Sequence, residues 1–367
     1  MVMKRYGNLF SQIIDIENLK LAHKNARKGK THYTDVKMVD SDPDRFLWTL
    51  HNSLKNKTFK TSPYVTKQIY EPKPRIIYKL PYYPDRIVHH AIMNVLQPVW
   101  DKTFIYDLYS AIPGKGLHAG SYRLRQFMRN KENTRYCLKF DISKFYPSIN
   151  HDILTEMICK KIKCKDTLGL LGEIVRSPGG NENVPIGNYL SQYFSNIYLS
   201  EFDHWIKEKK HMRYYIRYCD DGVILHKNKN ILLKLYSDID NYLSDNLKLT
   251  LNPKTEIIDV DKQGIDFLGY RCFIEYTLLR KQSALKFKKR IKSIETDSLD
   301  SHFIVNSIMS YIGWLSHCDS YNLLSKYIFE NQIVLSKLET ASKDLGIQNP
   351  LIKKYGGNHV RIYKTSI

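Results

Sequence analysis

Two adjacent carboxylates, Asp220 and Asp221, are the residues in this chain whose types and spacing most suggest chemistry. They lie between two alternating apolar runs, so we predict a hairpin over residues 212–227 with both aspartates and Gly222 at its junction. Like charges this close are costly unless a proton or a cation compensates them. Mg²⁺ with oxygen ligands is the usual cation where phosphates are handled. The alternative is a plain polar turn, because Asp and Gly are ordinary hairpin residues.

A third carboxylate follows a second predicted strand. Residues 136–140 alternate between apolar and polar side chains, and Asp141 comes directly after them. Asn150 then provides a cap for a helix that begins near residue 151. A strand-end carboxylate followed five residues later by Tyr146 is suited to a metal ligand beside an aromatic ring that contacts a sugar. A solvent-facing aspartate is the alternative.

Composition narrows the class of partner. The 367 residues include 57 Lys and Arg against 37 Asp and Glu, a formal charge of +20, which favours nucleic acid before membrane as the partner. The six cysteines are scattered without a C-x-x-C pair, which argues against a zinc site or a disulfide framework and suits a reducing cytosol. The first ten residues lack an apolar signal region and no 18-residue apolar run occurs, so we expect a soluble cytoplasmic protein without a membrane partner.

The segments before the first aspartate change from helical to extended patterns. Residues 1–60 have mainly helical spacing, and residues 64–80 predict two strands around a turn with Pro72 and Pro74. The basic residues of this hairpin could hold a triphosphate through charge-assisted hydrogen bonds; they include Lys67, Lys73 and Arg75. A solvated edge hairpin, charged against aggregation, is the alternative.

Between the aspartates, residues 184–206 predict a helix opened by Gly187. Glycine allows a backbone or a ligand to approach closely. Gln192 lies in the first turn of this helix, where the N-terminal dipole can face an anion.

After the hairpin, a short strand is predicted over residues 265–270, and residues 276–345 are expected to be helical. Seven basic residues fall within 13 positions at the start of this region: Arg280, Lys281, Lys286, Lys288, Lys289, Arg290 and Lys292. Such a run indicates a face that follows a phosphate backbone, with a merely solvated face as the alternative.

This order of motifs resembles the reverse transcriptase family over roughly residues 60–335. Tyr218-Cys219-Asp220-Asp221 matches the family's Y-x-D-D, Phe140-Asp141-Ile142-Ser143-Lys144-Phe145-Tyr146 matches its first metal-ligand segment, and Phe267-Leu268-Gly269-Tyr270 is similar to its primer-side strand. The resemblance implies an α+β right-hand polymerase. Its expected parts are N-terminal helices and fingers (1–135), a palm (136–275) with inserted fingers (about 156–185), a helical basic thumb (276–345) and a basic tail (346–367).

Within that family, Ile186-Gly187-Asn188-Tyr189-Leu190-Ser191-Gln192 departs from Q-G-x-x-x-S-P at both ends and resembles the enzymes of diversity-generating retroelements. Ser310-Tyr311-Ile312-Gly313-Trp314 and His317 look similar to the same group. The resemblance implies error-prone copying of a template-repeat RNA into cDNA, with a small accessory protein, in a bacterial or phage-encoded system. The alternatives are another prokaryotic reverse transcriptase, of the phage-defence or group II intron type, and a non-catalytic RNA-binding protein.

The resemblance also implies roles for individual residues. Asp141, Asp220 and Asp221, with Ile142 beside them, would hold two Mg²⁺ ions, for which Mn²⁺ can substitute, and Lys254 would protonate the leaving pyrophosphate. The dNTP site would comprise Arg75, Lys73, Lys67, Tyr146, Ile186, Gly187 and Gln192. Template RNA, primer and cDNA would contact Tyr218, Gly269, Arg280, Lys281, Lys286, Lys289 and Arg290. Because Ile186 replaces an amide near the incoming sugar, we expect lowered fidelity; a plain core residue is the alternative.

Overall fold

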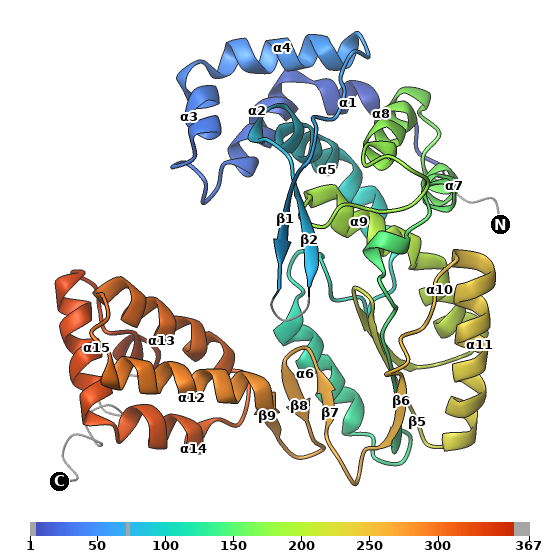
Figure 1. Ribbon diagram of the computed structural model, residues 1–367. Coiled ribbons are helices and arrows are strands. Elements are labelled where there is room, and N and C mark those ends of the chain that lie inside the picture. The colour runs from blue at the N-terminus through green and yellow to red at the C-terminus, as the bar shows by residue number, and fades with distance from the viewer. Residues whose placement is uncertain (1–4, 71–73, 356–367) are drawn as a thin grey trace. The chain divides into compact units, whose positions relative to one another are not determined.

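The computed structural model describes residues 5–70 and 74–355 (Figure 1). They form two compact units. The first comprises the described residues up to Gly116 together with Leu138–Ile257. The second comprises Leu117–Cys137 together with the described residues from Ile258 onward.

Helices dominate the start of the first unit, as the sequence predicted. They are α1 (Phe10–Ile14), α2 (Ile16–Ala26), α3 (Thr34–Ser41), α4 (Pro43–Lys55) and α5 (Ile87–Trp100). Local sequence determines where two of them begin: the Asp15 side chain accepts hydrogen bonds from the first backbone amides of α2, and Asp42 caps α4 ahead of Pro43. Their apolar faces bury residues such as Leu19, Leu50 and Ile92 in one core.

A two-stranded antiparallel hairpin, β1 (Val65–Ile69) and β2 (Arg75–Lys79), interrupts these helices (Figure 1). Lys67 lies opposite Ile77, and Ile69 lies opposite Arg75. Side chains alternate between the two faces of a strand, so Lys67, Arg75 and Ile77 share one face. Lys73, the third basic residue predicted for the triphosphate, lies outside the described residues.

The four-stranded sheet contains β3 (Tyr136–Phe140), β4 (Tyr214–Tyr218), β5 (Asp221–His226) and β6 (Glu256–Asp259), in the order β4-β5-β3-β6. The helices of this part of the chain are α7 (His151–Lys161), α8 (Lys165–Arg176), α9 (Tyr189–Tyr198), α10 (Ser200–His204) and α11 (Lys229–Leu247). As predicted, Asn150 caps α7, accepting hydrogen bonds from the amides of Asp152 and Ile153. Helix α11 turns Leu232, Leu235 and Ile239 into the core.

The second unit combines α6 (Leu117–Met128), the antiparallel sheet β7 (Ile265–Phe267), β8 (Tyr270–Cys272), β9 (Thr277–Leu279), and a group of helices seen in Figure 1. These helices are α12 (Lys281–Thr296), α13 (Ser301–Leu315), α14 (Tyr321–Leu324), α15 (Gln332–Asp344) and α16 (Pro350–Tyr355).

Two predictions for this unit were wrong. Residues 265–270 form two strands rather than one, because Leu268 and Gly269 adopt left-handed φ angles of 51° and 85° and reverse the chain. The region from residue 276 begins with β9 rather than a helix, because Thr277–Leu279 pairs with β8.

The α+β class expected from the sequence is confirmed: helices accompany three sheets formed by the described strands. None of the described helices has the length and apolar character needed to cross a membrane.

Candidate active site

The predicted hairpin is confirmed, but its turn is shorter than expected. Tyr218 is paired with Asp221, so the turn between β4 and β5 consists only of Cys219 and Asp220. Cys219 has a left-handed φ of 52°, an uncommon conformation for a residue with a side chain. Asp221 and Gly222, which the sequence placed at the junction, already belong to β5.

Gly222 permits the close packing of β5 on β3. A Cβ atom added to Gly222 would lie 2.1 Å from Cζ of Phe140, well inside contact distance. Phe140 is the last residue of β3, and Asp141 follows it directly. The absent side chain therefore lets the end of β3 approach the strand that carries Asp221. In the sequence, Gly222 had the pattern of a turn residue only, with no sign of this packing role.

Asn252 holds Asp141 in place. Its backbone N–H donates to the Asp141 carbonyl oxygen at 2.8 Å, and its Nδ2 donates to Asp141 Oδ2 at 2.9 Å. An antiparallel bridge between Ile142 and Leu251 continues the same contact. The Lys254 N–H donates to Asn252 Oδ1 at 3.0 Å, so the exposed Lys254 lies on the turn that orients the carboxylate. Sequence reasoning gave Asn252 no role, although its position before a proline marks a turn.

The three aspartates interact electrostatically. The pKa of Asp220 is raised to about 7, first by burial and then by the negative charges of Asp221 and Asp141. Among the described residues, no three His, Cys, Asp or Glu side chains form a closed metal-binding group. Mg²⁺ is usually held by one or two carboxylates together with waters and substrate phosphates. The hard oxygen donors and the mutual repulsion of these carboxylates therefore fit Mg²⁺ whose coordination the substrate completes.

Tyr146 lies against the turn formed by Cys219 and Asp220. Its hydroxyl is 3.3 Å from Ser195 Oγ and 4.0 Å from Cys219 Sγ. Its carbonyl accepts a hydrogen bond from the Val184 N–H at 2.9 Å. Burial, with the neighbouring Cys219 second, raises the pKa of its phenol above the ordinary value. The structure thus brings the predicted sugar-contacting residue to the turn and ties it to the segment that precedes Ile186.

The Ile186-Gly187 segment contacts the β1–β2 hairpin. The Tyr78 N–H donates to the Ile186 carbonyl at 2.8 Å. Gly187 has a φ of 114°, and a Cβ there would lie 2.9 Å from the Tyr78 oxygen and 3.0 Å from Cγ2 of Ile77. The close approach predicted for Gly187 is confirmed, and the approaching partner is strand β2.

The contact between Gly187 and strand β2 brings the helix entrance close to the hairpin that carries predicted dNTP residues. Lys67 and Arg75 are exposed and share the strand face of Ile77, which contacts Gly187. Ile186 is half-buried rather than buried, so it is not a core residue. Gln192 is exposed in the first turn of α9.

The predicted nucleic-acid residues of the second unit divide into two kinds. Arg280 is engaged by Asp266, with Nε and Nη2 at 2.6 and 2.5 Å from Oδ1, and Arg290 lies over the Phe303 ring at 4.5 Å. Gly269 packs on Trp314, whose Cζ3 would lie 2.6 Å from an added Cβ. The remaining members, Lys281, Lys286 and Lys289, are exposed along α12. Lys281 and Lys289 are therefore better placed than the two arginines to contact a phosphate backbone.

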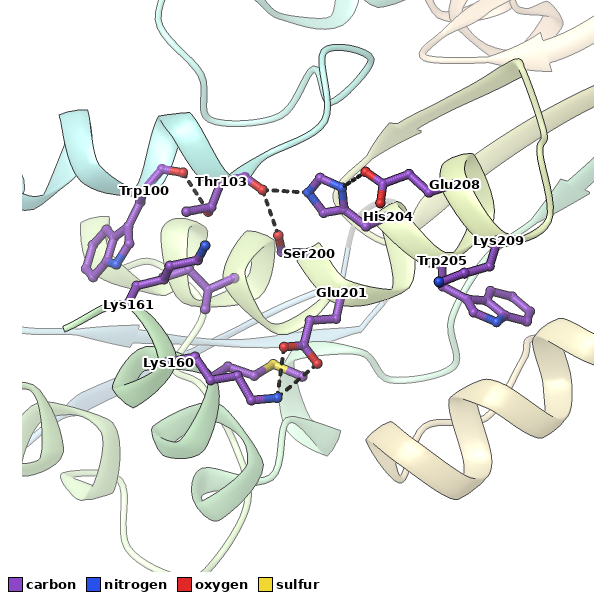
Figure 2. Close-up of a pocket in the computed structure, with 12 residues that line it drawn as sticks. Trp100, Thr103, Lys160, Lys161, Ser200, Glu201, His204, Trp205, Glu208 and Lys209 are labelled. Carbon is purple, nitrogen blue, oxygen red and sulfur yellow. Dashed lines mark hydrogen bonds and ion pairs between the residues drawn. The ribbon is translucent and has the colours of Figure 1, made fainter. Parts of the chain in front are cut away.

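A separate pocket of about 510 Å³ in the first unit is lined in part by Ser200, Glu201 and His204 of α10 (Figure 2). His204 Nε2 is 2.9 Å from the Thr103 carbonyl and Nδ1 is 2.7 Å from Glu208 Oε1. Both partners carry acceptor oxygens, so this arrangement favours the protonated ring. Burial lowers the pKa of His204, but the hydrogen bonds to Thr103 and Glu208 together raise it by more, so the net effect is a raised pKa. Ser200 also donates to the Thr103 carbonyl, at 3.1 Å, which fastens α10 in place.

Three curated proteins illustrate the sequence similarity of this chain. "Protein YkfC" of Escherichia coli (strain K12) is 25% identical over 56% of this chain and 63% of its own length. "Putative COX1/OXI3 intron 2 protein" of Saccharomyces cerevisiae is 20% identical over 92% of this chain and 46% of its own. "Group II intron-encoded protein LtrA" of Lactococcus lactis is 25% identical over 56% of this chain and 36% of its own. The chain therefore spans less than two thirds of the length of these relatives.

Among solved structures, apo telomerase from Candida tropicalis aligns with a TM-score of 0.45 and 14% identity, covering 83% of this chain and 66% of that one. The family model for "Reverse transcriptase (RNA-dependent DNA polymerase)" matches residues 65–272, more than half of the chain, and spans all three aspartates of the site. The chain therefore belongs to the reverse transcriptase family.

Proposed function

We propose that this protein is an RNA-dependent DNA polymerase. The observation that carries the proposal is the convergence of Asp141, held by Asn252, with the two-residue turn that presents Asp220 and Asp221. In this proposal the four-stranded sheet forms the palm, the β1–β2 hairpin belongs to the fingers, and the helices from α12 onward form the thumb.

The three aspartates would hold two Mg²⁺ ions, with the backbone of Ile142 beside them. Bound Mg²⁺ activates the primer 3′-hydroxyl and neutralises charge on the triphosphate and the leaving pyrophosphate. Asn252 keeps the Asp141 carboxylate oriented through its 2.9 Å hydrogen bond. Tyr146, half-buried beside the turn, supports the deoxyribose and excludes a 2′-hydroxyl by its bulk.

Basic side chains would manage the triphosphate. Lys67 and Arg75 lie on the hairpin face that contacts Gly187, so they can bind the β- and γ-phosphates of a nucleotide held near Ile186. Lys254 is exposed on the turn that contacts Asp141, which suits it to protonate the leaving pyrophosphate.

Primer extension tests the proposal. A DNA primer annealed to an RNA template is incubated with the purified protein, the four dNTPs and Mg²⁺, and products are resolved by length. We expect cDNA that reaches the template end. Binding of the RNA without extension, with Mg²⁺ or Mn²⁺, would instead indicate the non-catalytic RNA-binding alternative.

We further propose that the template is a template-repeat RNA and that copying is error-prone, as in diversity-generating retroelements, with a small accessory protein as partner. Support comes from Ile186 and Gln192, which stand where relatives with the common pattern carry Gln and Pro. A group II intron-type enzyme is the second candidate, favoured by the similarity to LtrA. A template and variable repeat pair in the flanking DNA would distinguish the two.

Replacing Ile186 by Gln is expected to lower misincorporation opposite template adenine about fivefold, because an amide restores a hydrogen bond that contributes ~1 kcal/mol to discrimination. Sequencing of cDNA made from a defined RNA template measures the error frequency. Ile231→Gln, on the exposed surface of α11, is the matched control and should leave errors unchanged. An unaltered error frequency in Ile186→Gln refutes this account of fidelity.

The exposed lysines of α12 give a separate expectation for nucleic-acid binding. Lys281→Ala combined with Lys289→Ala should reduce by about 2 the slope of log affinity against log salt for an RNA–DNA duplex, without changing Tm. Arg290→Ala should instead lower Tm, because it removes the side chain that packs over Phe303. Fluorescence anisotropy across a salt series and thermal unfolding measure the two effects. Equal salt slopes in all variants would show that α12 does not contact phosphates.

A further inference from the structure

Arg217 is a fully buried arginine in the strand that leads to the catalytic turn. Its side chain and that of Asp203 are both 0% exposed. Nε lies 2.7 Å from Asp203 Oδ1 and Nη2 lies 2.5 Å from Oδ2, a bidentate pair, and the Tyr215 hydroxyl donates to Oδ1 at 2.7 Å. A buried ion pair of this kind often contributes little net stability, because desolvation offsets the attraction. Its presence beside the turn therefore calls for another reason.

The remaining guanidinium nitrogen supplies that reason. Nη1 of Arg217 donates to the carbonyl oxygen of Cys219 at 2.7 Å. Cys219 is the residue with a left-handed φ of 52° in the two-residue turn, and Asp220 follows it directly. The hydrogen bond thus holds the peptide unit that joins Cys219 to Asp220.

The backbone of Arg217 is held by hydrogen bonds on both sides of the residue. The Arg217 N–H donates to the Asp107 carbonyl at 3.1 Å, and the Tyr109 N–H donates to the Arg217 carbonyl at 3.0 Å. Asp203 lies on α10, whose other side lines the pocket of Figure 2. There Ser200 and His204 both hydrogen-bond to the Thr103 carbonyl. Strand and helix are therefore both fastened before the guanidinium reaches the turn.

We propose that Arg217 is a positioning residue for the polymerase site: clamped by Asp203 and Tyr215, it fixes the Cys219 carbonyl and with it the turn that presents Asp220 and Asp221. The inference rests on the proposed function. Only arginine has a planar fork that can bind both carboxylate oxygens and still direct a third donor elsewhere. A lysine at position 217 can pair with Asp203 but cannot make all three bonds.

Two variants separate positioning from stability. Arg217→Lys keeps the charge and loses the fork. The triple variant Asp203→Leu, Tyr215→Phe and Arg217→Met replaces the buried polar cluster by apolar groups of similar size, an exchange that is often neutral or stabilising. We expect both to lower kcat for single-nucleotide addition by about 10- to 100-fold with little change in the KM for dNTP, because displaced ligands slow the chemical step. We also expect about tenfold weaker Mn²⁺ binding, measured by electron paramagnetic resonance without substrate.

The matched control is Lys210→Met. Lys210 forms another ion pair in the first unit, with Nζ 2.7 Å from Oδ2 of Asp238, a residue of α11. This variant should retain the kcat and Mn²⁺ affinity of the wild type.

Thermal unfolding establishes which variants are folded. If a folded triple variant keeps kcat within about twofold and binds Mn²⁺ as the wild type does, the positioning role is refuted. If the wild type extends no primer, the proposed function fails, and the Mn²⁺ measurement on the same variants still decides whether Arg217 organises the carboxylates.

Discussion

Replacing Asp220 and Asp221 together by asparagine is expected to abolish primer extension, lowering kcat by at least about a thousandfold, or ~4 kcal/mol. Asparagine matches aspartate in size but removes the charge that holds a hard cation. The loss should be the same with Mg²⁺ and with Mn²⁺. Extension of a labelled primer under single-turnover conditions measures it.

The same variant is expected to remain folded. The pKa of Asp220 is raised from 3.8 to about 7 by burial and by its acidic neighbours. An acid whose pKa rises on folding lowers the stability of the folded state as pH rises from the ordinary pKa to the folded one, because over that range only the unfolded chain has lost the proton; near pH 7 most of this loss is already present. Removing the charge should therefore leave Tm at neutral pH unchanged or raise it. RNA binding should persist as well.

Asp240→Asn, on the exposed surface of α11, is the matched control and should retain full extension. Activity in the double variant that equals this control would place the chemistry elsewhere. Loss of activity together with loss of folding would leave the wild-type primer extension and the metal-binding measurements to decide, because neither depends on this variant.

The second large effect concerns stability: Gly222→Ala is expected to lower the free energy of unfolding by about 1 to 3 kcal/mol. The added Cβ would lie 2.1 Å from Cζ and 2.4 Å from Cε1 of Phe140, so β3 and β5 must separate. The displacement also moves Asp141 relative to Asp221, and kcat should fall in the same variant. Chemical denaturation with an unchanged m-value measures the stability term.

Phe140→Leu provides the rescue for this prediction. In the double variant the smaller side chain makes room for the Cβ, so the two losses should be less than additive. Gly169→Ala in α8 is the control, since an added Cβ there meets no described atom within 4 Å and alanine favours the helix by up to about 1 kcal/mol. A Gly222→Ala protein as stable as the wild type would contradict the packing argument.

Local patterns in the sequence were sufficient to predict the strands that carry the aspartates. Alternation predicted the strands on both sides of the Cys219-Asp220 turn, and Asn150 predicted the start of α7, because strand faces and helix caps depend on residues a few positions apart. The motif order also predicted the family that the match over residues 65–272 shows. The single strand predicted for residues 265–270 was wrong because two consecutive left-handed residues reverse the chain there.

The sequence by itself therefore determined which residues are chemically able to act: three carboxylates, a basic hairpin and a basic helix. Only the tertiary structure decided how they are held. Asn252 reaches Asp141 across 111 positions of sequence, and Arg217 meets Asp203 on a different element. Folding likewise separated Arg280 and Arg290, which contact Asp266 and Phe303, from Lys281 and Lys289, which are exposed on α12. Such partners depend on long-range packing, which local spacing does not encode.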